Sequence, residues 1–106
     1  KVLAKARQRG VTVLAIKGLC RERWPQGDPL RKKYRMWYKP VLDRAEALLT
    51  LGYTLGQGVT AAIPPAEVTS HKIAIDVAPD IHKLTIAEMT KLREFVKGIT
   101  PLFPHA

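Results

Sequence analysis

The chain has 106 residues, of which 46% are hydrophobic and 25% charged, a balance typical of folded globular proteins and not of disordered chains. A chain of this length matches one ordinary domain, so we expect a single domain over residues 1–106 with one core. No apolar run approaches the roughly 18 residues that cross a bilayer, which excludes a membrane span.

The lone cysteine, Cys20, bears on the cellular compartment. It cannot form an internal disulfide, and no second cysteine suggests a zinc ribbon or a redox pair, so we expect the cytoplasm or another reducing compartment. Its apolar neighbours at helical spacing predict a buried small hydrophobe, not a reactive thiol. Because the chain starts at Lys1 without an apolar signal region, we interpret it as a segment of a longer protein.

The positive charge is confined to the first half. Residues 1–50 hold 13 Lys or Arg against 4 Asp or Glu, a net of +9, whereas residues 51–106 hold 5 against 5. A concentrated positive field attracts polyanions, of which nucleic acid is the commonest in cells. A basic face kept for solubility and an anionic membrane surface are the alternatives. We therefore distinguish a basic helical half, 1–52, from a neutral α/β half, 53–106.

Two helices are predicted before residue 24. Residues 1–9 are good helix formers and Gly10 is a typical residue after a helix end. Thr12 can cap a second helix over 13–23. The β-branched residues of 11–16 leave a strand as the alternative there. The second helix would bury one face, made of Val13, Ile16, Cys20 and Trp24.

A third helix is predicted to begin at Pro29, with Asp28 as its cap. Pro40 should kink or split it into 29–38 and 40–51, and Gly52 should end it. Its apolar stripe would be Leu30, Tyr34, Trp37, Val41, Ala45 and Leu48, and its cationic flank Lys32, Arg35 and Lys39.

The neutral half predicts a mixture of elements. Residues 53–63 suit a hairpin, and 71–77 alternate apolar and polar residues as a strand does. Thr85 and Glu88 form a capping box for a last helix with Met89, Leu92, Val96 and Ile99 on its buried side. The tail, 101–105, should extend over the core or fray. The predicted fold is α+β and mainly α, with a helical N-terminal half followed by a small β element and a C-terminal helix.

The segment 31–39 (RKKYRMWYK) interleaves five cations with three aromatic residues. Cations neutralise phosphates, and exposed aromatic rings can stack on unpaired bases. The apolar stripe assigns Tyr34 and Trp37 to the core, which leaves Tyr38 as the exposed aromatic candidate. The sequence therefore predicts a nucleic-acid-binding surface at this segment.

Helices over 13–23 and from 29, separated by a short turn, resemble a helix-turn-helix, and the hairpin at 53–63 would serve as its wing. The resemblance implies that Arg31, Lys32 and Arg35 face the major groove of DNA. The further candidate nucleic-acid-binding residues are Lys33, Tyr38 and Lys39 on the same segment and Lys5, Arg7, Arg9, Arg21 and Arg23 as phosphate contacts.

Catalytic patterns are weak, so we expect no enzyme activity and no cofactor. The sequence contains no phosphate-binding GxxxxGK[ST] loop, no GxGxxG and no GxSxG. The neighbouring His71, Asp76, Asp80 and His82 match no metal-ligand spacing, so we expect no metal. We predict a nucleic-acid-binding module that binds DNA in preference to RNA. An RNA or ribonucleoprotein component, and a protein-interaction domain whose residues 51–106 dock a partner or a second copy, are the alternatives.

Overall fold

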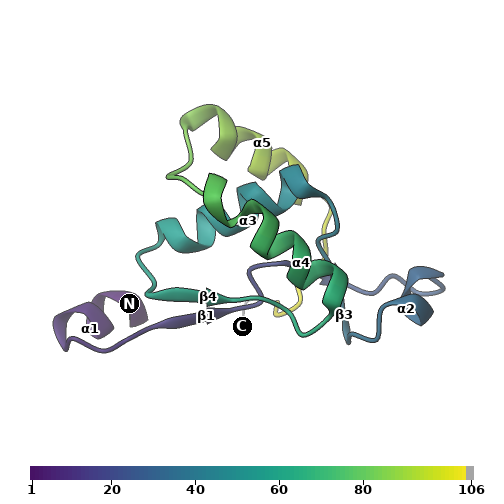
Figure 1. Ribbon diagram of the computed structural model, residues 1–106, viewed down its shortest axis with the longest axis horizontal. Helices are drawn as coiled ribbons and strands as arrows, with labels where there is room; N and C mark the ends of the chain where they lie inside the picture. Colours follow the sequence, from purple (N-terminus) through teal and green to yellow (C-terminus); the bar gives the residue numbers. More distant parts are fainter. Residues whose placement is uncertain (105–106) are drawn as a thin grey trace.

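The computed structural model describes residues 1–104 and has an α+β fold with 46% helix and 12% strand (Figure 1). Strands and helices are interleaved along the chain. Within the described residues, no helix is long and apolar enough to cross a membrane. The elements are α1 (Val2–Gln8), β1 (Leu14–Ile16), β2 (Cys20–Arg23), α2 (Leu30–Lys33), β3 (Tyr38–Pro40), α3 (Arg44–Gly56), β4 (Ala61–Ile63), α4 (Val68–Val77), the 3-10 helix η1 (Ala78–Asp80) and α5 (Ile86–Val96).

Two small sheets connect distant parts of the chain. β1 pairs in parallel with β4, with Ala15 opposite Ala62, and β2 pairs antiparallel with β3. Helices α3 and α4 lie on one side of the β1–β4 sheet (Figure 1). Because side chains alternate between the faces of a strand, Leu14, Ile16 and Ile63 lie on the other face, where they are exposed.

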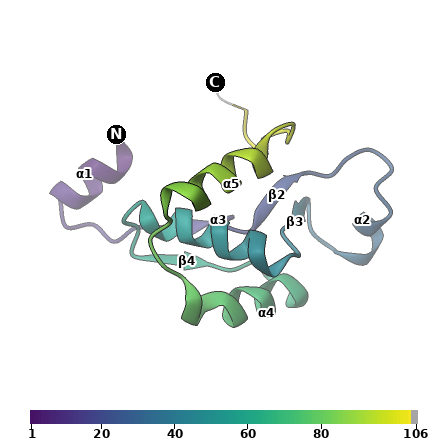
Figure 2. The ribbon, with the colours of Figure 1, turned by 90° about the horizontal axis from the view of Figure 1, so that it is seen from above.

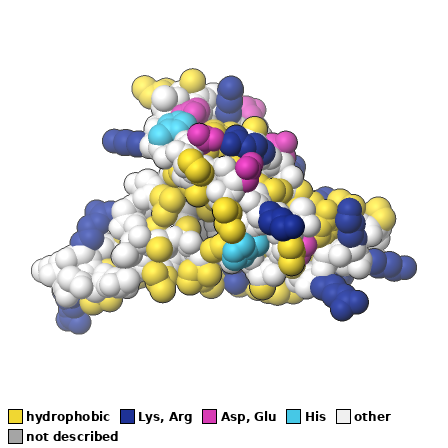
Figure 3. All heavy atoms as spheres, in the orientation of Figure 1, with side chains coloured by type: hydrophobic (Ala, Val, Ile, Leu, Met, Phe, Trp, Pro, Cys, Tyr) yellow, Lys and Arg dark blue, Asp and Glu magenta, His cyan; other side chains and the backbone are white. Residues whose placement is uncertain are grey.

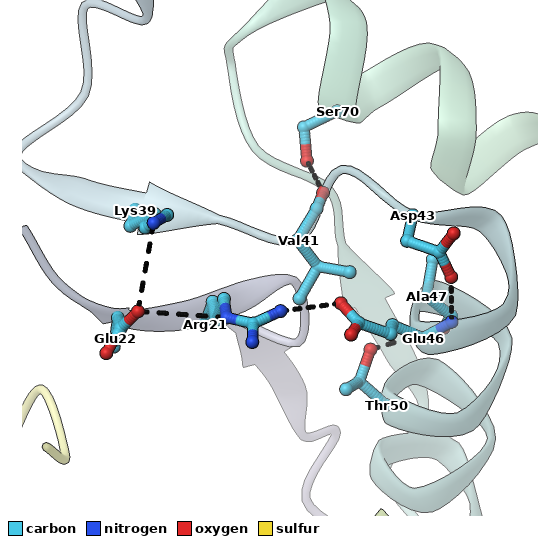
Figure 4. A network of polar contacts seen from close by, with 9 residues as sticks. All are labelled: Arg21, Glu22, Lys39, Val41, Asp43, Glu46, Ala47, Thr50 and Ser70. Carbon is cyan, nitrogen blue, oxygen red and sulfur yellow. Dashed lines mark hydrogen bonds and ion pairs between the residues drawn. The ribbon is translucent and has the colours of Figure 1, made fainter. Parts of the chain in front are cut away.

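The core joins the basic half to the neutral half. Leu19 and Val41, which flank the β2–β3 sheet, are almost fully buried, and the Val41 N–H donates to the Leu19 carbonyl O at 2.8 Å. The hydroxyl of buried Ser70 donates to the Val41 carbonyl O at 3.3 Å (Figure 4). The remaining core residues are Ala47 and Leu51 of α3 and Ala74 and Val77 of α4. Helix α3 lies between α4 and α5 (Figure 2).

The predicted positions of the first and last helices are confirmed, whereas the predicted burial of Val96 is wrong because this residue is exposed. Helix α1 ends at Gln8, and Gly10 follows with φ +63°, a conformation that favours glycine. Helix α5 begins with the expected capping box, in which the Thr85 hydroxyl accepts from the Glu88 N–H and the Glu88 carboxylate accepts from the Thr85 N–H. Leu92 is the buried residue of this helix, which ends at Val96.

The predicted helix over 13–23 is wrong, because these residues form β1, a turn and β2. The alternative strand over 11–16 is confirmed for Leu14–Ile16. The Val13 carbonyl O accepts from the Thr60 N–H at 2.8 Å, a bond across 47 residues that no local pattern reveals. The helix-turn-helix arrangement of residues 13–39 is therefore also wrong.

The predicted third helix is wrong over residues 34–43, which are not helical, and its second part ends later than expected. Only Leu30–Lys33 are helical in the segment 29–38, and Tyr38–Pro40 pair with β2. Helix α3 begins after Asp43, whose carboxylate accepts from the Glu46 N–H at 2.9 Å. It continues through Gly52, which is buried.

Two β predictions in the neutral half are wrong. Residues 53–56 belong to α3, and Ala61–Ile63 pair with β1, so there is no 53–63 hairpin to act as a wing. Residues 71–77 are part of α4, because the Glu67 carboxylate caps that helix by accepting from the Ser70 N–H at 2.8 Å. Ser70, Ala74 and Val77 are spaced as one helical face, and this face is buried. The predicted order, a helical half followed by a β element, is replaced by interleaving.

Candidate nucleic-acid interface

The aromatic residues of the basic segment are placed by β3, and two of the three assignments are reversed. Tyr34 is buried, as predicted, but Tyr38 is only 6% exposed and Trp37 is 60% exposed. Trp37 lies at a bend just before β3, where its ring meets the buried Tyr38 ring edge to face, with 5.5 Å between the ring centres, and stays in contact with solvent. Trp37 is therefore the exposed aromatic residue of the segment, and the prediction for Tyr38 is wrong.

Trp37 lines two hollows whose walls also include cationic side chains. One is a groove of about 630 Å³ whose cations are Lys17, Lys33 and Arg35 and whose apolar wall includes Ile16, Ile63 and Val68. The other, of about 360 Å³, is lined by Arg23, Trp24, Arg31 and Leu102 as well as Trp37. We call Trp37 together with the five cations Lys17, Arg23, Arg31, Lys33 and Arg35 the Trp37 surface.

The loop before Trp37 is anchored by two hydrogen-bonded side chains. The Trp24 indole N–H donates to the Met36 carbonyl O at 2.7 Å. The Asp28 carboxylate accepts from the Lys39 ammonium at 2.8 Å and from the Leu30 N–H at 2.9 Å. The bond from Lys39, followed by the bond from Leu30, lowers the pKa of the Asp28 carboxyl group. Lys39 therefore holds the loop in shape and is a positioning residue.

Lys17 is a member of the Trp37 surface that sequence reasoning missed. Its φ of +65° is unusual for a residue other than glycine. Its ammonium nitrogen lies 5.1 Å from the centre of the Trp37 ring and 5.9 Å from that of Tyr38, within the range of a cation–π interaction. The Lys17-Gly18 pair after an apolar run was the available signal, because a turn there ends the strand and redirects the chain.

The predicted cations fall into separate groups. Arg31, Lys32, Lys33 and Arg35 are exposed on α2 and the residues just after it. Lys5, Arg7 and Arg9 belong to or follow α1, which lies at the opposite end of the molecule from α2 (Figure 1). The space-filling view shows Lys and Arg side chains at both ends (Figure 3). The structure therefore does not bring the α1 cations to the Trp37 surface.

Several predicted phosphate contacts already have partners within the protein. The Arg21 guanidinium lies between two carboxylates, 2.8 Å from Glu46 and 3.7 Å from Glu22 (Figure 4). Arg7 donates to the Gln57 carbonyl O at 2.6 Å. These contacts join β2 to α3 and α1 to the residue that follows α3, so we interpret Arg21 and Arg7 as structural.

The polar residues considered for chemistry lie elsewhere. Arg44 binds both Asp76, at 3.0 Å, and Asp80, at 2.6 Å, so these two carboxylates share one guanidinium. Within residues 1–104, no group of three or more His, Cys, Asp or Glu side chains is arranged to hold a metal ion. Burial raises the pKa of the half-buried Cys20 thiol to about 11, which keeps it protonated at neutral pH.

Comparisons with protein-family models, with curated proteins and with solved structures find no match for this chain. The assignment of a function therefore depends on the geometry and charge of the Trp37 surface.

Proposed function

We propose that this chain binds single-stranded nucleic acid on the Trp37 surface. The observation that carries the proposal is the exposed Trp37 ring, which lines two hollows that are also lined by cations. An exposed indole offers a flat face for an unpaired base, and a stack of this kind contributes about 1–3 kcal/mol per base. Lys and Arg on either side supply the charge that the backbone phosphates require.

The structure favours a single strand over a duplex as the ligand. Recognition of the major groove by a helix needs a helix long enough to reach several base edges, and α2, the helix that carries the cations, has only four residues. In a duplex the base faces are already stacked on one another, so the Trp37 ring would have no base to contact. Phosphates and base faces are common to DNA and RNA, so both belong in the test.

A binding experiment with single-residue variants tests the role of Trp37. We expect labelled single-stranded DNA or RNA of about 15 nucleotides to bind more tightly than a duplex of the same sequence. Replacing Trp37 with Ala should weaken binding about 5- to 100-fold through loss of one stack. Tyr53→Ala is the matched control, because Tyr53 is a similarly exposed aromatic residue on α3. Equal effects of the two variants, measured by fluorescence anisotropy, would exclude Trp37 as a stacking residue.

The salt dependence of binding tests the cations independently. If about four phosphates are neutralised, log K should fall with log salt with a slope of roughly −2.8 for a single strand. The double variant Lys33→Ala/Arg35→Ala should reduce this slope to roughly −1.4. Lys72→Ala/Lys91→Ala removes the same charge from α4 and α5 and should leave most of the slope intact. No binding of any nucleic acid at low salt would exclude the proposal and favour a protein partner.

A further inference from the structure

Two residues of the C-terminal segment 101–104, Leu102 and Phe103, contact the Trp37 surface. The Arg23 guanidinium donates two hydrogen bonds to the Leu102 carbonyl O, through Nε at 3.1 Å and Nη2 at 3.0 Å. The ring of Phe103 lies against that of Trp37, with 6.1 Å between the centres and 63° between the planes. These contacts join residues more than 60 positions apart, so they require the tail to fold back.

The tail also approaches the cation beside Trp37. The Lys17 ammonium nitrogen lies 6.0 Å from the centre of the Phe103 ring and 5.1 Å from that of Trp37. Lys17, Arg23 and Trp37 thus all have a partner in the tail. An aromatic ring on the indole and a carbonyl oxygen on the guanidinium are the same kinds of contact that a base and a phosphate oxygen would make.

We propose that residues 101–104 act as an intramolecular competitor that occupies part of the nucleic-acid-binding surface. The proposal rests on the proposed function, because it assigns a regulatory role to the tail at that same site. The binding-competent molecule is then the one in which the tail has left Trp37, and the measured affinity is reduced by the fraction of molecules in that state.

The geometry indicates that the competitor can be displaced. The two rings meet edge to face and not in a full stack. Both remain largely exposed, Trp37 at 60% and Phe103 at 66%, so little apolar surface is buried between them. A base that covers the indole face would bury more of it than Phe103 does.

Replacing Phe103 with Ala should tighten binding of single-stranded oligonucleotides about 2- to 10-fold, the range expected from the loss of one aromatic pair. Phe103 is exposed, so the substitution should leave the core intact. Tyr53→Ala is again the control and should not change the affinity. The probe is a 15-residue oligothymidylate at low salt, measured by fluorescence anisotropy on the full chain.

The tail contact itself can be observed without any ligand. In NMR spectra of the free protein, Phe103→Ala should shift the Trp37 indole N–H signal and the Lys17 ε-methylene signals, because the ring current of Phe103 is lost. Adding the oligonucleotide to the unmodified chain should remove the contact between Phe103 and Trp37.

The outcomes distinguish failure of this inference from failure of the proposed function. If both forms bind and Phe103→Ala binds no more tightly, or more weakly, the tail is not a competitor. If Phe103→Ala leaves the Trp37 and Lys17 signals unchanged, the contact is absent in solution and the inference is wrong. If neither form binds, the proposed function is wrong and the competitor role falls with it, even where the NMR contact persists.

Discussion

Residues 14–43 and residues 44–96 are built on different principles. The first region contains three short strands and one turn of helix, and its strand β1 pairs with a strand more than 40 residues away. The second contains three α-helices, each with a side chain that caps its start. Residues 14–43, which carry most of the proposed nucleic-acid-binding surface, therefore depend for their shape on packing against residues 44–96, which carry most of the core.

The largest expected effect comes from the buried residue at the junction of the two regions. Leu19 is 1% exposed, whereas Leu14 is 55% exposed. Leu19→Ala should reduce the free energy of unfolding by about 2–5 kcal/mol, a large part of the 5–15 kcal/mol typical of a domain. Leu14→Ala removes the same atoms from an exposed position and should cost much less. Urea denaturation of both variants measures the free energy of unfolding. Equal decreases in the two variants would show that burial of Leu19 does not hold the two regions together.

Substitutions at two glycines of α3 should change stability by an intermediate amount. A Cβ atom at Gly52 would lie 2.8 Å from a Leu84 methyl carbon and 3.2 Å from the His82 carbonyl O, whereas one at Gly56 meets open space. Gly52→Ala should cost about 1–3 kcal/mol through overpacking. Gly56→Ala should be neutral or stabilise by up to about 1 kcal/mol, because it reduces the freedom of the unfolded chain. Thermal unfolding of both variants tests this prediction. Equal destabilisation by Gly52→Ala and Gly56→Ala would show that close packing at Gly52 is not the cause of the loss.

The smallest expected effects are local and depend on pH in opposite directions. Hydrogen bonds from the His82 ring to the Asp80 carbonyl O and then to the Glu88 carboxylate raise the His82 pKa above its ordinary value of 6.5. The stabilisation by this group is complete below that ordinary value and is lost as pH rises through the raised pKa. The Asp28 pKa is lowered, so its contribution is present above the ordinary value of 3.8 and is lost as pH falls.

Amide hydrogen exchange can separate these two titrations. Raising the pH from about 6 to about 9 should loosen the Asp80–Thr85 connection and leave the relative protection of the Leu30 amide unchanged. Lowering it toward about 2.5 should expose the Leu30 amide, which donates to Asp28. His82→Gln should abolish the first response and keep the second. If the Leu30 amide and the amides of the Asp80–Thr85 connection both lose protection at high pH, the loop at Asp28 and the connection at His82 do not open separately.

Local sequence signals predicted the two helices α1 and α5, whose hydrogen bonds are also local. The capping box of Thr85 and Glu88 predicted the start of α5 because both partners lie within one helical turn. The α1 helix and the turn at Gly10 were predictable for the same reason. The alternation of 71–77 was misleading, since Ser70, Ala74 and Val77 also satisfy helical spacing and the cap at Glu67 selects the helix.

The sequence predicted which types of residue form the candidate site, but it did not predict how their side chains are arranged. The concentration of cations in residues 31–39 was evident from the sequence, and Arg31, Lys33 and Arg35 remain in the Trp37 surface. The exposure of Trp37 and the burial of Tyr38 were not, because they depend on whether the backbone at that point is helical or extended. Lys17 reaches the site through the end of β1.

The sequence by itself determined the charge of each half, the caps of the last helix and the chemical character of the basic segment, because these properties belong to residues that are neighbours in the chain. Only the tertiary structure decided which aromatic ring faces solvent, which cations are neutralised by carboxylates, and where the tail lies. Each of these depends on contacts between distant segments: β1 with β4, Arg21 with Glu46, and Arg23 with Leu102. Their energies outweigh the modest local preferences that favoured helices over residues 13–23 and 29–38.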